Sequence, residues 1–353
     1  MNYQEQLNQL LNTVVNDGAS DLHLSEGRHP TLRVSGQLIP LSKMNPLTHA
    51  DIEGLLKAMV PEKTMNKFIE TKEMDFAYDF GAGGRFRGNA FVQKSFFSVV
   101  LRLIPKTIKT IAELGLPDVL ENFARKEQGF FLIVGPVGMG KTTTLAAMIE
   151  IVNNERAAHI ITVEDPIEYV YEQKKAIIDQ REVGIDTETF ASGLQSVFRQ
   201  DVNVLLIGEM RGPETMAAAV TAAETGHLVF STLHTNNAAQ TIDRIIDTFP
   251  GEQQDQIRIQ LASSLLGIFS QRLVPRLSGG MIPAYELLIA NNAVSNLIRE
   301  KRTHEINTII ETSLQEGMID MNRSLAELVR RGEISIESAY QHSINPKILE
   351  KYL

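Results

Sequence analysis

The sequence contains no cysteine and no tryptophan among its 353 residues. The lack of cysteine excludes disulfides and any cysteine-ligated zinc or iron–sulfur centre. No apolar stretch approaches the roughly 18–20 residues of a membrane-spanning helix, and the N-terminus lacks the basic and apolar regions of a secretory signal. The net charge of −9 provides no basic surplus for binding nucleic acid. These absences predict a cytoplasmic protein that reaches a membrane only through a partner, and they argue against nucleic acid as a ligand.

The chain is longer than a single hydrophobic core usually organises, so two domains are expected. Residues 1–104 mix amphipathic helices with alternating strands, which predicts a small α+β domain with a mainly antiparallel sheet. Residues 105–115 are predicted to be a linker. In 116–290, apolar strands alternate with helices as in a parallel α/β sheet, and 291–353 is predicted to be helical. Strands are expected at 130–134, 159–163, 204–207, 228–232 and 283–289, and one helix is expected at 253–271.

A glycine-rich loop between a predicted strand and a predicted helix matches the pattern G-x-x-x-x-G-K-[ST]. The glycines let successive backbone N–H groups turn towards one phosphate chain, and the helix N-terminus adds positive potential there. Lys141 is placed to reach the β- and γ-phosphates, and the Thr142 hydroxyl is placed to hold Mg²⁺. The sequence therefore predicts a nucleoside-triphosphate site made by Gly135, Pro136, Val137, Gly138, Met139, Gly140, Lys141, Thr142 and Thr143.

Acidic residues and histidines follow the predicted parallel strands, where side chains face a bound nucleotide. We expect Glu164 to polarise the attacking water and Glu209 to help hold Mg²⁺. His227 and His234, which bracket one strand, are further candidate catalytic residues. All four residues could instead simply end strands, and this alternative has more weight for the two histidines than for Glu164 and Glu209. Gly208 stands where the usual Walker B motif has an aspartate. The sequence therefore leaves open which of Thr142, Glu209 and Asp165 are the metal ligands.

One face of the strand at 85–93 carries Arg85, Arg87 and Asn89, because side chains alternate across a strand. Arg102 lies on the next predicted strand and could add a third guanidinium. From the pattern alone, a solvated strand face is the favoured interpretation.

Several motifs in order resemble the secretion-type ATPases and, within them, the type IV pilus retraction motors of the PilT family. The resemblance covers nearly the whole chain. It includes the phosphate loop, Thr162–Tyr169, which resembles the family's Asp box, and Leu206–Arg211, which resembles the family's own Walker B form with Gly208 in place. Residues 221–235 resemble its His box. The segment at 293–300 resembles the retraction motors' signature but departs from it at Val294 and Ser295.

The resemblance implies a small PAS-like N-terminal domain, a RecA-like ATPase core and a helical C-terminal extension. It also implies ATP and Mg²⁺ as cofactors, and a homohexamer with shared nucleotide sites. In that assembly Arg85, Arg87 and Arg102 would approach ATP held by a neighbouring subunit, which reverses the preference for a solvated face. The expected function is pilus disassembly at the inner face of the cytoplasmic membrane, through contact with an inner-membrane pilus platform protein.

Alternatives remain at this point. A pilus assembly or type II secretion ATPase shares the core motifs, but such proteins usually carry a longer N-terminus with a four-cysteine zinc motif. A nucleotide-sensing regulatory module would bind ATP without using hydrolysis for work. A nucleic-acid translocase is disfavoured by the acidic charge balance.

Overall fold

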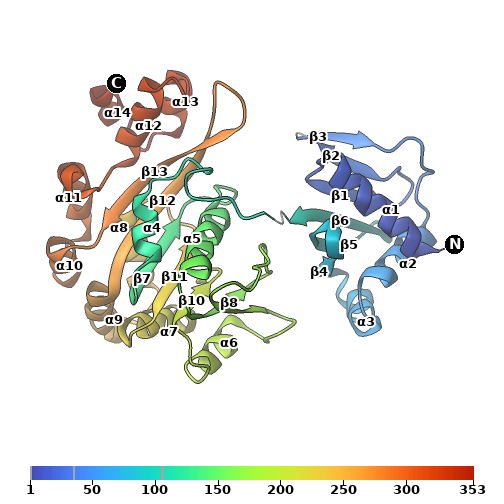
Figure 1. Ribbon diagram of the computed structural model, residues 1–353, viewed down its shortest axis with the longest axis horizontal. Helices are drawn as coiled ribbons and strands as arrows, with labels where there is room; N and C mark the ends of the chain where they lie inside the picture. Colours follow the sequence, from blue (N-terminus) through green and yellow to red (C-terminus); the bar gives the residue numbers. More distant parts are fainter. Residues whose placement is uncertain (1, 35, 105–106) are drawn as a thin grey trace. The chain divides into compact units, whose positions relative to one another are not determined.

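The computed structural model describes residues 2–34, 36–104 and 107–353, and the chain forms two compact units, Met1–Thr107 and Ile108–Leu353 (Figure 1). The division falls within the predicted linker 105–115, of which 105 and 106 lie outside the described residues. Ile111 is buried in the core of the second unit with Leu116 and Leu120. The chain from 108 onward is therefore part of the second unit.

The first unit is a six-stranded sheet covered by helices on one face, in the strand order β3-β2-β1-β6-β5-β4. All its described strand pairs are antiparallel. Its elements are α1 (Tyr3–Asn16), β1 (Asp21–Ser25), β2 (Thr31–Val34), β3 (Gln37–Pro40), α2 (His49–Met59), α3 (Glu62–Thr71), β4 (Glu73–Asp79), η1 (Gly81–Gly83), β5 (Arg85–Gln93) and β6 (Phe96–Ile104).

Local sequence explains the helices of the first unit. The apolar positions Leu7, Leu10, Leu11 and Val14 of α1 recur at helical spacing and are all buried. Helix α2 begins at a capping box in which Thr48 and Asp51 bond each other's backbone N–H groups, as the sequence predicts. The helices cover the face of the sheet that carries the apolar strand residues, which leaves the polar face of β5 and β6 outside this core.

The second unit is a seven-stranded sheet in the order β13-β12-β7-β11-β10-β8-β9, with parallel pairs from β12 through β9. Its strands are β7 (Gly129–Val134), β8 (His159–Glu164), β9 (Ile177–Glu182), β10 (Val204–Ile207), β11 (Leu228–Leu233), β12 (Leu265–Pro275) and β13 (Met281–Ile289). Its helices are α4 (Val119–Ala124), α5 (Lys141–Glu155), α6 (Phe190–Val197), α7 (Pro213–Glu224), α8 (Ala238–Asp247), α9 (Gly251–Ser264), α10 (Asn292–Arg299), η2 (Thr303–Glu305), α11 (Ile306–Thr312), η3 (Leu314–Glu316), α12 (Met321–Arg330), α13 (Ile336–His342) and α14 (Pro346–Tyr352).

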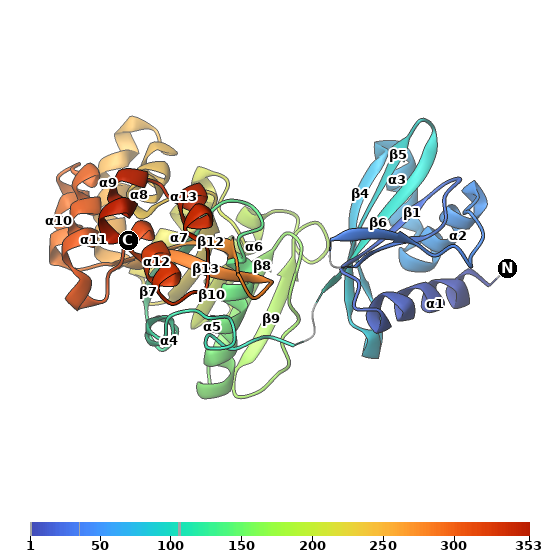
Figure 2. The ribbon, with the colours of Figure 1, turned by 90° about the horizontal axis from the view of Figure 1, so that it is seen from above.

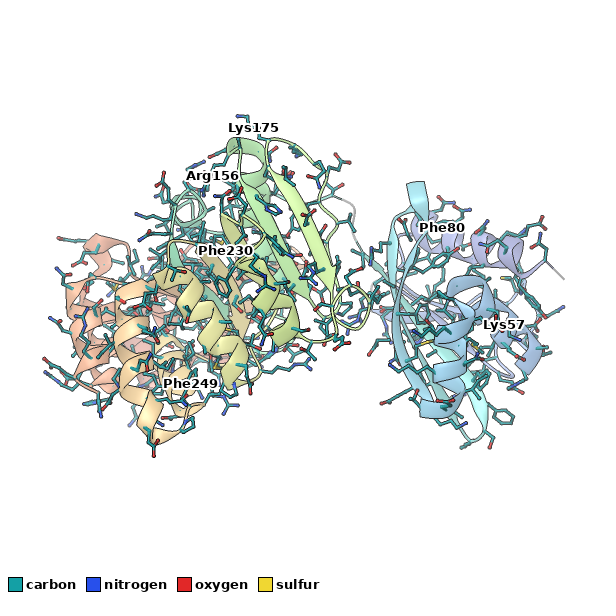
Figure 3. All side chains as sticks on the ribbon, turned by 90° about the horizontal axis from the view of Figure 1, so that it is seen from below. Lys57, Phe80, Arg156, Lys175, Phe230 and Phe249 are labelled. Carbon is teal, nitrogen blue, oxygen red and sulfur yellow. The ribbon has the colours of Figure 1, made fainter. Side chains whose placement is uncertain are left out.

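Both faces of this sheet are buried, because successive strand residues point to opposite faces and both are apolar. Phe131 and Phe230 pack with α4 and α5, whereas Phe130 and Val229 pack with α7, α8 and α9. Phe230 is fully buried and lies in the interior of this unit in Figure 3. The orange-to-red helices α10 to α13 gather at the β12–β13 side of the unit (Figure 2). This packing fixes the carboxyl ends of the central parallel strands at one edge.

The predicted single helix at 253–271 is wrong. Helix α9 ends at Ser264, and the chain continues directly into β12, whose pairing with β7 shifts register between Leu265 and Gly267. Apolar residues occur at helical spacing across this boundary, so periodicity alone does not separate the two elements. Pairing of β12 with β7 on one side and β13 on the other decides the conformation.

Candidate nucleotide site

The glycine-rich loop connects β7 to α5, and its backbone needs conformations that only glycine adopts readily. Gly135, Gly138 and Gly140 have positive φ angles of 144°, 79° and 78°. A Cβ on Gly135 would lie 2.3 Å from the carbonyl oxygen of Gln271, so a larger residue would collide with the backbone of β12. The loop thus turns against β12 and leads into the N-terminus of α5, where backbone N–H groups favour an anion.

Lys141 is buried at the start of α5 and its ammonium group lies inside this loop. It donates hydrogen bonds to the carbonyls of Gly135 at 2.8 Å and Pro136 at 3.0 Å, and it lies 3.2 Å from Nδ1 of His234. Burial lowers the pKa of Lys141, while the charges of Glu209 and Glu168 act in the opposite direction. An ammonium held at loop carbonyls is placed to bind the phosphates of a nucleotide.

Thr142 and Thr143 follow on the first turn of α5 and are both half-buried. The Thr143 hydroxyl lies 2.9 Å from the Tyr169 hydroxyl, which ties α5 to the segment after β8. Among the described residues, the Thr142 hydroxyl makes no hydrogen bond, so it is free to act as a metal ligand. The donor set here, one hydroxyl with nearby carboxylates, fits Mg²⁺, which keeps several waters and takes phosphate oxygens as ligands.

Glu164 ends β8 and is almost completely buried, with 5% of its surface exposed. Its Oε1 accepts hydrogen bonds from the Thr162 hydroxyl at 2.6 Å and from the Gln180 amide at 3.4 Å. Burial raises the pKa of Glu164 to about 7, and the two side-chain hydrogen bonds oppose that rise. A carboxyl with this pKa exchanges protons readily near neutral pH.

Glu209 follows β10 and lies beside Arg211 of the same loop and beside His234, which follows β11. Arg211 forms an ion pair with its Oε1, and Nε2 of His234 lies 3.6 Å from its Oε2. The second guanidinium nitrogen of Arg211 is 4.0 Å from Asp165. Together with the Lys141 contact, this places the His234 imidazole between the loop lysine and Glu209. Four predicted site residues, Lys141, Asp165, Glu209 and His234, are therefore brought to one edge of the sheet.

Gly208, which stands where an aspartate is usual, packs directly against β8. A Cβ at this position would lie 3.3 Å from Cα of Glu164 and 3.4 Å from the carbonyl oxygen of Val163. Its N–H donates to that carbonyl at 2.9 Å, and its own carbonyl accepts from the Thr232 hydroxyl at 2.7 Å. The absence of a side chain lets β8 and β10 keep this close approach beside Glu164.

His227 lies at the opposite end of β11 from His234. Leu228 pairs with Gly129 at the start of β7, whereas Leu233 pairs with Val134, which precedes the phosphate loop. The His227 ring contacts the carbonyl of Ala222 at 2.9 Å and packs on Phe198. The predicted catalytic role of His227 does not fit this chain's own loop, because the length of the strand separates them.

The three predicted arginines lie on the sheet of the first unit. Arg87 and Arg102 are direct cross-strand partners, and Arg102 is in turn opposite Asp21, which is opposite Arg33. Arg85 is two residues from Arg87 on β5, so it faces the same side. The Arg102 guanidinium is 2.8 Å from the buried carboxylate of Asp21 and is itself 68% exposed. The structure therefore brings the arginines together on one polar face.

Gln271, Thr162, Gln180 and Tyr169 contact the site but were not predicted individually. Gln271 on β12 accepts a hydrogen bond from Thr144 at 2.7 Å and donates one to the Met139 carbonyl at 2.8 Å. The next residue, Arg272, donates to the carbonyl of His342 on α13 at 2.8 Å. Because β12 was predicted as helix, nothing in the pattern placed Gln271 at the loop.

These features define the class of protein. A parallel sheet whose central strand leads through a glycine-rich loop to a buried lysine, with acidic residues at the ends of the adjacent strands, is a P-loop nucleotide-hydrolase core. The family of type II/IV secretion system proteins matches residues 2–345 of this chain.

Individual relatives are similar over almost their full length. The chain is 42% identical over 341 residues to the type IV pilus retraction ATPase PilT of Pseudomonas aeruginosa, covering 97% of this chain and 99% of that protein. It is 41% identical over 317 residues to a twitching motility protein of Neisseria gonorrhoeae, covering 90% and 84% of the two chains. A crystal structure of the pilus retraction motor PilT with bound ADP superposes with a TM-score of 0.92 at 43% identity, covering 98% of each chain. The chain belongs to the type II/IV secretion system protein family, and within it to the PilT-type ATPases.

Proposed function

We propose that this chain is an ATP-hydrolysing motor that drives disassembly of type IV pili. The observation that carries the proposal is the placement of Lys141, His234 and Glu209 in one connected group beside the buried Glu164. The similarity to PilT, over nearly the full length of both chains, supports the type IV pilus as the structure on which the motor acts.

Each residue has a distinct task in this proposal. The backbone N–H groups of the loop and Lys141 bind the phosphates of ATP. Thr142, with Glu209 or Asp165, holds Mg²⁺, which supplies charge neutralisation to the transferring phosphoryl group when bound. Glu164 accepts the proton of the attacking water. His234 accepts a hydrogen bond from Lys141 through Nδ1 and directs Nε2 towards Glu209, so it fixes the lysine and the acid relative to each other.

The proposed working form is a homohexamer in which each nucleotide site is shared. The first unit presents Arg87 and Arg102 on one face, with Arg85 on the same side, but it carries no phosphate loop. An arginine supplied from a neighbouring subunit would neutralise charge on the transferring phosphoryl group, a contribution of about 10³–10⁵ in rate. ATP binding would close one subunit interface and hydrolysis would release it.

We place the motor at the inner face of the cytoplasmic membrane, held by an inner-membrane pilus platform protein. In the parts of the chain that the structure describes, no helix is long and apolar enough to cross a membrane. Contact with a membrane-embedded partner would couple the movement of the ring to the base of the pilus.

The first experiment measures steady-state ATP hydrolysis by the assembled protein with Lys141→Ala or Glu209→Ala. We expect turnover to fall at least about a hundredfold, because each change removes charge at the phosphates or the metal. Lys175→Ala is a matched control, since Lys175 is an exposed lysine of the same unit whose side chain makes no hydrogen bond to any residue that the structure describes. Near-normal turnover in the Lys141 or Glu209 variant would overturn the assignment. Binding of ATP by the wild type without repeated turnover would instead indicate a regulatory sensor.

The second experiment tests whether the motor disassembles or assembles the pilus. Deletion in the source organism is scored for pilus number and twitching, with complementation by the wild type, Lys141→Ala and Lys175→Ala. Excess pili that do not retract, restored to normal by the wild type and by Lys175→Ala only, are expected for a retraction motor. Cells without pili would indicate an assembly ATPase.

A further inference from the structure

The chain that follows Glu164 runs alongside β9 without forming a strand of its own. Residues 167–173 have no regular secondary structure, although Ile167 and Tyr171 are buried. Buried backbone N–H and C=O groups outside helices and strands need partners from side chains or from water. The partners of segment 167–171 therefore decide how this part of the chain is held beside the nucleotide site.

Side chains of β9 hold segment 167–171 by three hydrogen bonds to its backbone. Glu182 accepts the N–H of Ile167 at 3.2 Å. The amide of Gln180 donates to the Tyr169 carbonyl at 2.7 Å and accepts the N–H of Tyr171 at 3.0 Å. Gln180 thus supplies one donor and one acceptor to the segment, as the backbone of a neighbouring strand would.

The same amide of Gln180 also reaches Glu164. Its Nε2 lies 3.4 Å from Oε1 of Glu164, the oxygen that accepts the Thr162 hydroxyl at 2.6 Å. Thr162 and Glu164 of β8 pair in register with Gln180 and Glu182 of β9, so the four side chains project from one face of the sheet. One nitrogen atom of Gln180 therefore joins the Glu164 carboxylate to the carbonyl of Tyr169.

Tyr169 extends this connection to α5. Its hydroxyl lies 2.9 Å from the hydroxyl of Thr143, which is on the first turn of α5 beside Thr142. Two side chains, those of Gln180 and Tyr169, therefore link the carboxylate at the end of β8 to the helix that follows the phosphate loop.

We propose that Gln180 and Tyr169 are positioning residues that set the Glu164 carboxylate relative to the phosphate loop. The inference rests on the proposed function, in which Glu164 accepts the proton of the attacking water. A reacting group that is misplaced by about 1 Å can lose about 10²-fold in rate. Among the described residues, neither side chain hydrogen-bonds to loop residues 135–142. Their loss should therefore slow the chemical step and leave the affinity for ATP nearly unchanged.

The first test measures kcat and KM for ATP in Gln180→Met, which keeps the length of the side chain and removes its donor and acceptor. We expect kcat to fall about tenfold while KM changes less than about twofold, because only the chemical step loses its geometry. Near-normal kcat in Gln180→Met would overturn the positioning role of Gln180.

Gln173→Met is the matched control for this change. The Gln173 amide accepts the N–H of Ile178 at 2.9 Å and donates to its carbonyl at 2.7 Å, so it also makes two backbone hydrogen bonds beside β9. It makes no hydrogen bond to Glu164 among the residues that the structure describes. Gln173→Met should therefore keep the wild-type kcat, and a loss equal to that of Gln180→Met would overturn the proposal.

The pH dependence of hydrolysis separates positioning of Glu164 from a purely structural role. Burial raises the pKa of Glu164, the hydrogen bond from Gln180 acts against that rise, and the charge of Glu168 adds to it. The ascending limb of the pH–rate profile should move to higher pH in Gln180→Met. It should move further in Gln180→Glu, which puts a second carboxylate beside Glu164. Gln173→Met should keep the wild-type profile, and an unmoved limb in both Gln180 variants would overturn the proposal.

Tyr169→Phe removes only the hydroxyl group and keeps the ring, so the variant remains foldable. We expect kcat to fall about threefold to tenfold, the effect of one neutral hydrogen bond. In a Thr143→Val background the same change should cost less than about a further twofold, because the bond is already absent. Tyr340→Phe, at an exposed tyrosine of α13, is the matched control. Losses that multiply in the double variant would overturn the connection through Thr143.

The wild type and Glu164→Gln distinguish failure of this inference from failure of the proposed function. If the wild type hydrolyses ATP, Glu164→Gln is inactive, and Gln180→Met and Tyr169→Phe are near normal, the positioning role alone is overturned. If Glu164→Gln keeps near-normal hydrolysis, the proposed function of Glu164 fails and the positioning role fails with it.

Discussion

Gln271 and Met139 join β12 to the phosphate loop: the Gln271 side chain donates to the Met139 carbonyl at 2.8 Å. The oxygen of the same amide accepts a hydrogen bond from the Thr144 hydroxyl of α5. One side chain therefore contacts both the loop, at Met139, and the first turn of α5, at Thr144. In addition, the sulfur of Met139 accepts the N–H of Leu273 at 3.3 Å. The loop conformation therefore depends on a strand about 130 residues further along the chain.

Gln271→Ala should destabilise the protein and weaken nucleotide binding. The change removes the donor to the Met139 carbonyl and the shorter of the two hydrogen bonds of the Thr144 hydroxyl, which keeps only its 3.2 Å bond to the Gly140 carbonyl. Loss of such a partner costs about 1–3 kcal/mol. We expect a matching fall in the free energy of unfolding, measured by urea denaturation, and about tenfold weaker ADP binding by calorimetry. Gln253→Ala, at an exposed position of α9, should change neither quantity. Wild-type ADP affinity in Gln271→Ala would show that the loop is held without this side chain.

The rate of hydrolysis should rise with pH through the titration of Glu164. Because the pKa of Glu164 is raised to about 7, the carboxylate that accepts the proton of water increases in population between about pH 6 and pH 8. The same shift means that the neutral carboxyl contributes stability below its ordinary pKa of 4.5, and that this contribution is lost as pH rises through about 7.

Thr162→Val should move the ascending limb of the pH–rate profile to higher pH by about one pH unit. The Thr162 hydroxyl donates to the Glu164 carboxylate and favours its charged form, and a hydrogen bond to a charged group is worth about 1.5–3 kcal/mol. The measurement is steady-state hydrolysis from pH 5.5 to pH 9. Thr312→Val, at an exposed helix position, serves as the control. A profile that does not move would exclude Glu164 as the titrating base.

Introducing the usual Walker B aspartate at position 208 should lower the rate of ATP hydrolysis rather than raise it. The added Cβ would lie 3.3 Å from Cα of Glu164, and a second carboxylate there would raise the pKa of Glu164 further. We expect Gly208→Asp to reduce hydrolysis at pH 7 at least about tenfold. Gly208→Ala separates the two effects, because it adds the Cβ without the charge and should cost less. Higher activity in Gly208→Asp would show that the site lacks a metal ligand.

The proposed sharing of nucleotide sites between the subunits of a hexamer predicts complementation. Arg87→Ala hexamers and Lys141→Ala hexamers should each be nearly inactive. Dissociated and reassembled mixtures should regain part of the hydrolysis rate, because some interfaces combine an intact loop with an intact arginine. Mixed hexamers of the expected mass, seen by native mass spectrometry, with no recovered activity would argue against an arginine acting across the interface.

Much of the nucleotide site can be predicted because most of its residues are close in sequence and bind the same phosphate chain. The loop 135–143 combines the required glycines, lysine and hydroxyls in one segment. Glu164 and Glu209 are also predictable, since the carboxyl ends of parallel strands meet at one edge. The same rule favours His234 over His227: only His234 follows the carboxyl end of β11.

The remaining contacts depend on tertiary structure. Gln271 reaches the loop only because β12 pairs beside β7, and helical spacing conceals that strand in the sequence. The burial that raises the pKa of Glu164 comes from packing around the ends of β8 and β9. In the first unit, the alternation of side chains along a strand places Arg85 and Arg87 on one face. The pairing register that sets Asp21 beside Arg102 can be read only from the folded structure.

Gln271 and Arg272 are consecutive residues of one strand, so their side chains leave the sheet on opposite sides. One binds the backbone of the phosphate loop, and the other binds the end of α13. A single peptide unit therefore separates the nucleotide loop from the last helices of the chain. Because the side chains of Gln271 and Arg272 connect that loop to α13 through β12, we expect a reporter attached to α13 to respond when the loop is displaced relative to β12.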